Sequence, residues 1–148
     1  MHNLKLATEN DWPHVLRMAK SFHETSPYGG LEFSEASCRA MFDKYLKGDR
    51  RELIVILAGE IPYGMIVGYS SSLPFSLDRV AMELAWWVDE DKRGTKESLL
   101  LFKAYEDWCV RIDCKIAQMA MLDDVTNLRK FYLKQGYRPA EQSFIKEL

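Results

Sequence analysis

Hydrophobic positions follow two different periods along the chain, and the change of period predicts where a strand gives way to a helix. A nearly continuous apolar run over Val80–Val88 is interrupted by one carboxylate, Glu83, as expected of a strand buried within a sheet. From Ser98 onward apolar residues recur at helical spacing: Leu101, Tyr105, Trp108 and Ile112. The charged segment Asp89–Arg93 is therefore a predicted turn, and the helix is predicted to begin close to Thr95.

The first third of the chain predicts a short strand and two helices. Leu4–Leu6 shows strand alternation, and the helix that follows has Pro13 in its first turn. Ser34 is predicted to cap a second helix, which Gly48 ends. A proline and two glycines oppose regular structure over residues 26–30, so this segment is a predicted loop. The two helices and their loop form either a substrate rim or a helical hairpin that covers one sheet face. The rim residues are Tyr28, Glu32 and Phe33.

The middle of the chain predicts an antiparallel meander. Leu53–Ala58 and Tyr63–Tyr69 are apolar runs separated by a short turn, as in a hairpin. Gly64 and Gly68 inside the second run favour a bulge or the close approach of another group. The polar residues 70–74 are predicted to lead, as a loop, into the strand that contains Glu83.

The last third predicts a crossover and two further elements. Lys115–Leu122 reads as a buried strand, and a strand, helix and strand in succession imply parallel pairing. The remaining predictions are a polar connection over residues 123–126, a helix over Asn127–Gln135 that ends at a left-handed Gly136, and a final strand over Tyr137–Leu148. The predicted fold class is one mixed α/β domain over residues 1–148, with an antiparallel meander, one parallel crossover and helices on both faces.

The amino-acid composition and net charge disfavour several classes of function. A chain of 148 residues, 47% of them hydrophobic, is long enough for one soluble domain with its own core. The net charge of −2 provides no basic field, which disfavours nucleic-acid binding. No apolar run approaches membrane-spanning length and no leader pattern begins the chain, so we expect a cytoplasmic protein without membrane contact. The three cysteines and three histidines lack the spacing of a metal site, and we expect no bound metal.

The turn before the long helix has the composition of a phosphate site. The first turn of a helix presents unpaired N–H groups at the positive end of its dipole. Gly94 lets the backbone approach a ligand, and neighbouring side chains add hydroxyl and cationic donors. These neighbours are Arg93, Thr95, Lys96 and Ser98. The alternative is an ordinary connection with a solvated charge cluster.

Two motifs make the chain resemble the GCN5-related N-acetyltransferases, which transfer an acyl group from acyl-CoA to an amine. The segment Arg93–Leu100 is similar to the pyrophosphate loop of that family, and Asn127 with Phe131–Tyr137 is similar to its later helix. The resemblance covers nearly the whole chain and extends to small stand-alone members, including those carried by bacteriophages. Lys96 departs from the family pattern, which has glycine there. It either points outward and attracts phosphate, or marks weakened cofactor binding; the charge favours the first.

The resemblance implies acetyl-CoA as co-substrate and a residue-by-residue layout for it. Main-chain groups at Trp86 and Val88 would pair with the pantetheine arm as an added strand would. Asn127 would bond to the pantetheine or its thioester end, unless it serves as a helix N-cap. The implied cofactor-binding residues are Trp86, Trp87, Val88, Arg93, Gly94, Thr95, Lys96, Glu97, Ser98 and Asn127. A homodimer is common among such proteins.

Two residues are candidates for the chemistry. Glu83 is a candidate base, because burial raises the pKa of a carboxylate toward neutral; alternatively it lies on an open strand face or pairs with Arg79. Tyr132 is a candidate acid for the departing thiolate, or a core residue at helical spacing. The predicted function is direct transfer of acetyl to a primary amine of a small molecule, a lysine side chain or a protein N-terminus. The alternative is a domain of the same fold that binds acyl-CoA or a protein partner without turnover.

Overall fold

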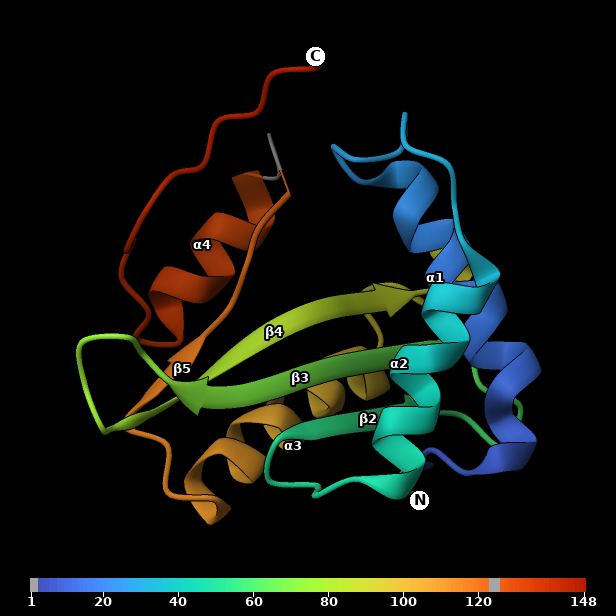
Figure 1. The fold of residues 1–148 in the computed structure, drawn as a ribbon, viewed down its shortest axis with the longest axis horizontal. Coiled ribbons are helices and arrows are strands. Elements are labelled where there is room, and N and C mark those ends of the chain that lie inside the picture. Colours follow the sequence, from blue (N-terminus) through green and yellow to red (C-terminus); the bar gives the residue numbers. More distant parts are fainter. Residues whose placement is uncertain (1–2, 123–125) are drawn as a thin grey trace.

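A five-stranded sheet forms the centre of the molecule. The computed structural model describes residues 3–122 and 126–148. In this part the strands lie in chain order (Figure 1) and are β1 Leu4–Leu6, β2 Leu53–Ala58, β3 Gly64–Ser72, β4 Arg79–Val88 and β5 Ile116–Gln118. The helices are α1 Trp12–Thr25, α2 Glu35–Lys47, α3 Lys96–Arg111 and α4 Thr126–Lys134, with short 3-10 turns at Glu9–Asp11 and Glu90–Lys92. None of these helices is both long enough and apolar enough to cross a bilayer.

The pairing confirms the predicted meander and crossover. The first four strands pair antiparallel, and β4 pairs with β5 in parallel. The predicted loop over residues 70–74 is wrong at its start, because β3 continues through Ser72. Ser70 is buried there, and its hydroxyl bonds to the Arg51 carbonyl and accepts a hydrogen bond from Arg79 Nη1 at 2.8 Å. Satisfied in this way, a serine costs a buried strand little.

Helices cover both faces of the sheet, as predicted. α1 and α2 lie on one face and α3 on the other (Figure 1). Side chains of β2 alternate between the two cores, so that Val55 packs toward α1 and α2 while Ile56 packs toward α3. The adjacent Trp86 and Trp87 likewise contribute to opposite cores. The polar N-cap Ser34 accepts a hydrogen bond from Ser37 N at 3.1 Å, as predicted for the start of α2.

A bulge interrupts the pairing of β3 with β4. Val67 pairs with Ala85 and Gly68 with Glu83, so Leu84 is an extra residue on β4. Gly68 is also a site of close approach, because a Cβ there would lie 2.7 Å from Tyr105 Cε2 on α3. The close approach predicted for Gly68 is therefore present, and the bulge lies opposite it, on β4.

Two predictions about the last third of the chain are wrong. β5 has three residues rather than eight, and residues 137–148 form no strand. The segment is held where it leaves α4, through Tyr137 N to Tyr132 O at 3.0 Å and Tyr137 Oη to Glu106 at 3.1 Å. Beyond Tyr137 its apolar side chains stay exposed, Phe144 at 86%, so no packing favours a strand there. The left-handed Gly136 is confirmed, with φ of 91°. Most of the predicted connection over residues 123–126 lies outside the described residues.

Candidate active site

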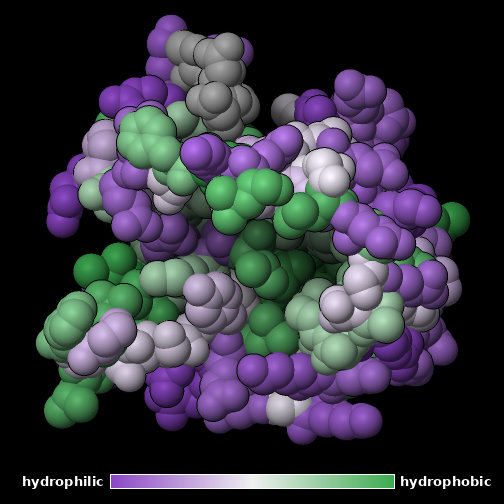
Figure 2. Space-filling view, turned by 45° about the horizontal axis from the view of Figure 1, so that its top comes forward, coloured by the Kyte–Doolittle hydropathy of each residue, from purple (hydrophilic) through white to green (hydrophobic). Residues whose placement is uncertain are grey.

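β4 and β5 diverge halfway along β4. Their parallel ladder ends where Met82 pairs with Gln118, while β4 continues to Val88. Among the described residues no strand pairs with this second half of β4 on the β5 side. Figure 2 shows a hollow in the surface with a hydrophobic floor and a border of both hydrophilic and hydrophobic residues. An extended ligand could lie here against an exposed strand edge.

The backbone groups of Trp86 and Val88 face this open edge. Asp89 N donates to Tyr63 O at 2.8 Å, which directs every second residue of the strand end toward β3. The residues between them, Trp86 and Val88, must direct their N–H and C=O groups to the other side. The Val88 carbonyl accepts a hydrogen bond from Arg93 Nε at 2.9 Å. The strand end and the turn before α3 are thus directly joined.

The start of α3 contains a buried hydroxyl that no described residue satisfies. Thr95 occupies the N-cap with extended backbone, and its side chain makes no capping hydrogen bond within the described part of the chain. Its Oγ1 atom is buried and has no hydrogen-bond partner among residues 3–122 and 126–148. A buried polar group left in this state costs about 1–3 kcal/mol. A ligand with acceptor oxygens would provide the missing partner.

Gly94 and Ser98 shape the same helix end. Gly94 has a φ of 76°, a left-handed conformation that favours glycine, and a Cβ there would meet no described heavy atom within 4 Å. Ser98 is buried, and its hydroxyl donates to the Thr95 carbonyl at 2.7 Å. The first-turn N–H groups of α3 therefore start beside open space. Residues of this kind fit an anionic group such as a diphosphate.

The two charged residues of this first turn differ in placement. Lys96 is exposed, which agrees with the outward orientation that its charge favoured. Glu97 is half-buried and lies close enough to Tyr63 for its charge to add to burial in raising the pKa of that phenol. The Glu97 carboxylate thus lies within electrostatic reach of Tyr63, next to the β2–β3 turn.

Glu83 is largely enclosed on the α3 face of β4. Burial raises the pKa of its carboxyl to about 7, and a hydrogen bond from the Ala120 backbone partly opposes this rise. The alternative of a pair with Arg79 is not supported, because Arg79 Nη1 bonds to Ser70 instead. A carboxyl that titrates near neutral pH is suited to take up a proton.

Tyr132 is a core residue, as one of its two predicted interpretations has it, and its role as an acid stays a prediction. Its side chain is 8% exposed and belongs to an aromatic cluster with Phe102, Phe131 and Tyr137. Its hydroxyl donates to the Ala120 carbonyl at 2.9 Å. Burial, and then the charge of Glu83, raises the pKa of this phenol. Sequence reasoning missed Ala120, whose backbone lies between Glu83 and Tyr132, because main-chain groups leave no signal in residue type.

The remaining predicted residues lie further out. Asn127 is exposed in the first turn of α4, which already includes Thr126, so it is not the residue before the helix. Tyr28 is 52% exposed in the loop after α1, Glu32 is exposed, and Phe33 packs against His23 at a tilt, with ring centroids 5.6 Å apart. The C-terminal segment reaches this loop, since a Cβ on Gly30 would lie 3.6 Å from Glu147 Oε1. The described residues contain no cluster of three or more His, Cys, Asp or Glu side chains that could hold a metal ion.

Comparison of the structure with solved proteins identifies its fold. It superimposes on a transcriptional regulator from Bacillus halodurans with a TM-score of 0.79 at 17% identity, over 100% of both chains. The aminoglycoside enzyme AAC(6')-Iy, solved with a CoA-S-monomethyl-acetylneamine bisubstrate analogue, gives a TM-score of 0.78 at 12% identity, over 100% of this chain and 98% of the other. The chain has the GNAT acyl-CoA N-acyltransferase fold.

An acetyltransferase from Trypanosoma brucei shows the same GNAT fold, with a TM-score of 0.74 at 16% identity over 100% of both chains. At the level of sequence, no protein-family model matches the chain and no curated protein is significantly similar to it. The likeness is therefore one of architecture, and the predicted fold class is confirmed.

Proposed function

We propose that the chain is an acetyl-CoA-dependent N-acetyltransferase that acts on a primary amine. One observation carries the proposal: β4 extends past the end of its pairing with β5, toward a helix end where the buried Thr95 hydroxyl has no partner among the described residues. An open strand edge suits the amide groups of a pantetheine arm, and a helix N-terminus suits a diphosphate. The fold shared with acetyltransferases supports the same reading.

The cofactor is held by the residues that the sequence indicated. Trp86 and Val88 offer main-chain groups to the pantetheine arm, with Trp87 between them. Gly94 and the first-turn amides of α3 receive the diphosphate, assisted by Thr95 and Ser98. Arg93 and Lys96 flank this turn, Asn127 is assigned to the pantetheine or its thioester end, and the charge of Glu97 acts on Tyr63. Acetyl-CoA supplies the acyl group as an activated thioester.

The remaining steps belong to protein side chains. Glu83, with a pKa of about 7, accepts the proton that an ammonium group must lose before its nitrogen can attack. Main-chain N–H groups near Val88 stabilise developing negative charge on oxygen. Tyr132 holds its proton at neutral pH, because its pKa is raised, and gives it to the sulfur leaving group. The same raised pKa makes it a weak acid, so its contribution is smaller than that of Glu83.

The acceptor is an amine of undetermined size. Exposed carboxylates near the loop after α1, among them Glu24 and Glu32, favour a cationic acceptor. Asp43 contributes less to this field than its charge implies, because Arg39 Nε bonds to it at 3.0 Å. A small-molecule amine, a lysine side chain and a protein N-terminus all remain within the proposal.

Release of free thiol from acetyl-CoA tests the proposal. Purified protein is incubated with acetyl-CoA and, in turn, a polyamine, an aminoglycoside, a lysine-containing peptide and a peptide with a free N-terminus. We expect amine-dependent thiol release with at least one of them. Binding of acetyl-CoA without release on any amine would instead support the alternative of a non-catalytic acyl-CoA-binding domain.

A further inference from the structure

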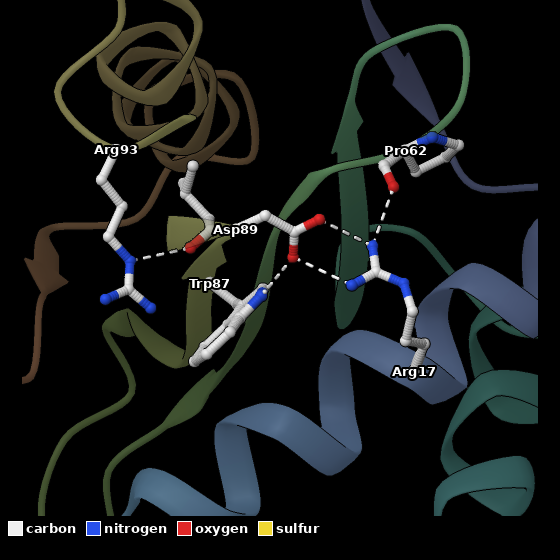
Figure 3. Close-up of polar contacts among 6 residues, drawn as sticks. Arg17, Pro62, Trp87, Asp89 and Arg93 are labelled. Carbon is white, nitrogen blue, oxygen red and sulfur yellow. Dashed lines mark hydrogen bonds and ion pairs between the residues drawn. The ribbon is translucent and has the colours of Figure 1, made fainter. Parts of the chain in front are cut away.

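Arg17 on α1 makes a bidentate ion pair with Asp89, the first residue of the turn between β4 and α3 (residues 89–95, the cofactor turn). Its Nη1 and Nη2 atoms donate to Oδ1 and Oδ2 of Asp89, each at 2.9 Å, and Nη2 also donates to the Pro62 carbonyl at 3.2 Å (Figure 3). The partners are 72 residues apart in sequence. Bidentate pairing fixes the orientation of both groups more strictly than a single contact does.

Asp89 transmits this restraint to the strand end. Trp87 Nε1 donates to Asp89 Oδ1 at 2.9 Å, so the carboxylate is shared between the guanidinium and the indole. Burial alone would raise the pKa of Asp89, yet the bonds from Arg17 and Trp87 and the charges of Arg17 and Arg93 hold that pKa below its usual value. The carboxylate is therefore ionised and engaged at neutral pH.

Trp87 in turn supports Arg93. The Arg93 guanidinium lies 4.8 Å from the Trp87 ring centroid, within the range of a cation–π contact, and Arg93 Nε holds the Val88 carbonyl (Figure 3). The contacts thus run without a break from α1 through Asp89 and Trp87 to Arg93. They end at the open edge of β4 and the turn before α3.

We propose that Arg17 is a positioning residue for the coenzyme A diphosphate. Its ion pair with Asp89 restrains the turn between Asp89 and Thr95. Gly94 and the first amides of α3 are therefore already ordered before the ligand binds. The inference rests on the proposed function, since it concerns the same cofactor turn. It adds a residue of α1, the helix that also leads into the predicted acceptor rim. Helix α1 therefore contributes to both sides of the reaction.

Arg39 provides a matched control. Like Arg17, it is an arginine in surface ion pairs: it pairs with two carboxylates, Glu9 at 2.7 Å and Asp43 at 3.0 Å, and its guanidinium lies over the Trp12 ring. Its side chain is 32% exposed, against 47% for Arg17. The residues that it contacts, Glu9, Trp12, Phe42 and Asp43, belong to α1, α2 and the turn before α1, so Arg39→Ala tests loss of a similar surface pair away from the cofactor turn.

The test is the dissociation constant of coenzyme A, measured by calorimetry for the wild-type protein, Arg17→Ala, Arg17→Lys and Arg39→Ala. We expect Arg17→Ala to bind about fivefold more weakly, Arg17→Lys to fall between, and Arg39→Ala to match the wild type. In steady state, Arg17→Ala should raise the KM for acetyl-CoA and leave kcat unchanged. Arg17→Lys keeps the charge and serves where Arg17→Ala fails to fold.

The outcomes separate this inference from the proposed function. Equal binding by Arg17→Ala and the wild type, or equal weakening in Arg17→Ala and Arg39→Ala, would overturn the positioning role and leave the acetyltransferase proposal intact. A wild-type protein that does not bind coenzyme A would overturn both.

Discussion

At the scale of single residues, Glu83 is the proposed general base. It is the one carboxylate in the sequence of β4, and its burial beside the Ala120 backbone gives it a pKa of about 7. The ionised form is the one that accepts a proton. Rate should therefore rise as pH increases through 7 and level off above it.

Glu83→Gln tests this role directly. Loss of a general base lowers kcat by a factor of about 100, and the rise in rate near pH 7 should disappear with it. The measurement is a pH–rate profile of thiol release with the best acceptor. Glu60→Gln, which changes an exposed carboxylate in the β2–β3 turn, serves as the control and should keep the wild-type profile. An unchanged profile in Glu83→Gln would remove Glu83 from the mechanism.

The same carboxyl makes a prediction about stability. Its pKa rises from 4.5 in the unfolded chain to about 7 in the folded protein, so the folded state favours the protonated form. This stabilisation is complete below about pH 4.5 and is lost as pH rises through 7. Glu83→Gln should consequently gain about 2 kcal/mol of unfolding free energy relative to the wild type at pH 8, and little at pH 4. Urea unfolding at the two pH values measures this, and an equal difference at both would contradict the assignment.

At the scale of elements, the contact between β3 and α3 depends on a missing side chain. A Cβ on Gly68 would lie 2.7 Å from Tyr105 and 3.1 Å from Trp108, both large and buried. Gly68→Ala should lower the unfolding free energy by about 1–3 kcal/mol through overpacking. Gly64→Ala in the same strand is the control, because its Cβ would meet the flexible end of Leu101 at 3.1 Å and should cost less. Chemical unfolding of both variants compares them, and a larger loss in Gly64→Ala would refute the argument.

The elements differ in how far the sequence could predict them. β2 and the helices were predictable, because long apolar runs and capping residues such as Ser34 mark them locally. The length of β5 was not, since it depends on where β4 diverges, and an apolar run does not record its partner. The final strand over residues 137–148 was wrongly predicted for a similar reason: the order of elements led us to expect a strand, while a strand needs an edge to pair with.

Some features of the candidate site could be predicted from the sequence and others could not. The placement of Gly94, Thr95 and Ser98 at the start of α3 was predictable from the change of period between strand and helix. The Arg17–Asp89 pair was not, because a contact over 72 residues leaves no local pattern. Glu83 was found as the carboxylate of an apolar strand, and the alternative that it pairs with Arg79 is not supported, because Arg79 Nη1 bonds to Ser70.

At the scale of the whole molecule, the sheet is a support with an opening at one side. β1 to β4 and the helices on both faces form two cores, and β5 leaves β4 at Gln118. The end of β4, the turn after it and the start of α3 lie together at this opening. A ligand there would contact main-chain groups, which side-chain substitution changes little.

Calorimetric titration of coenzyme A into the wild-type protein and into Thr95→Val tests the central claim most directly. The account predicts one coenzyme A per chain, with affinity about tenfold lower in Thr95→Val, because the hydroxyl no longer reaches the diphosphate. The thermal stability of unliganded Thr95→Val should equal or exceed that of the wild type, since a buried hydroxyl without a partner has been removed. Absence of binding heat at millimolar coenzyme A, or equal affinity in the two proteins, would contradict the diphosphate site at the start of α3.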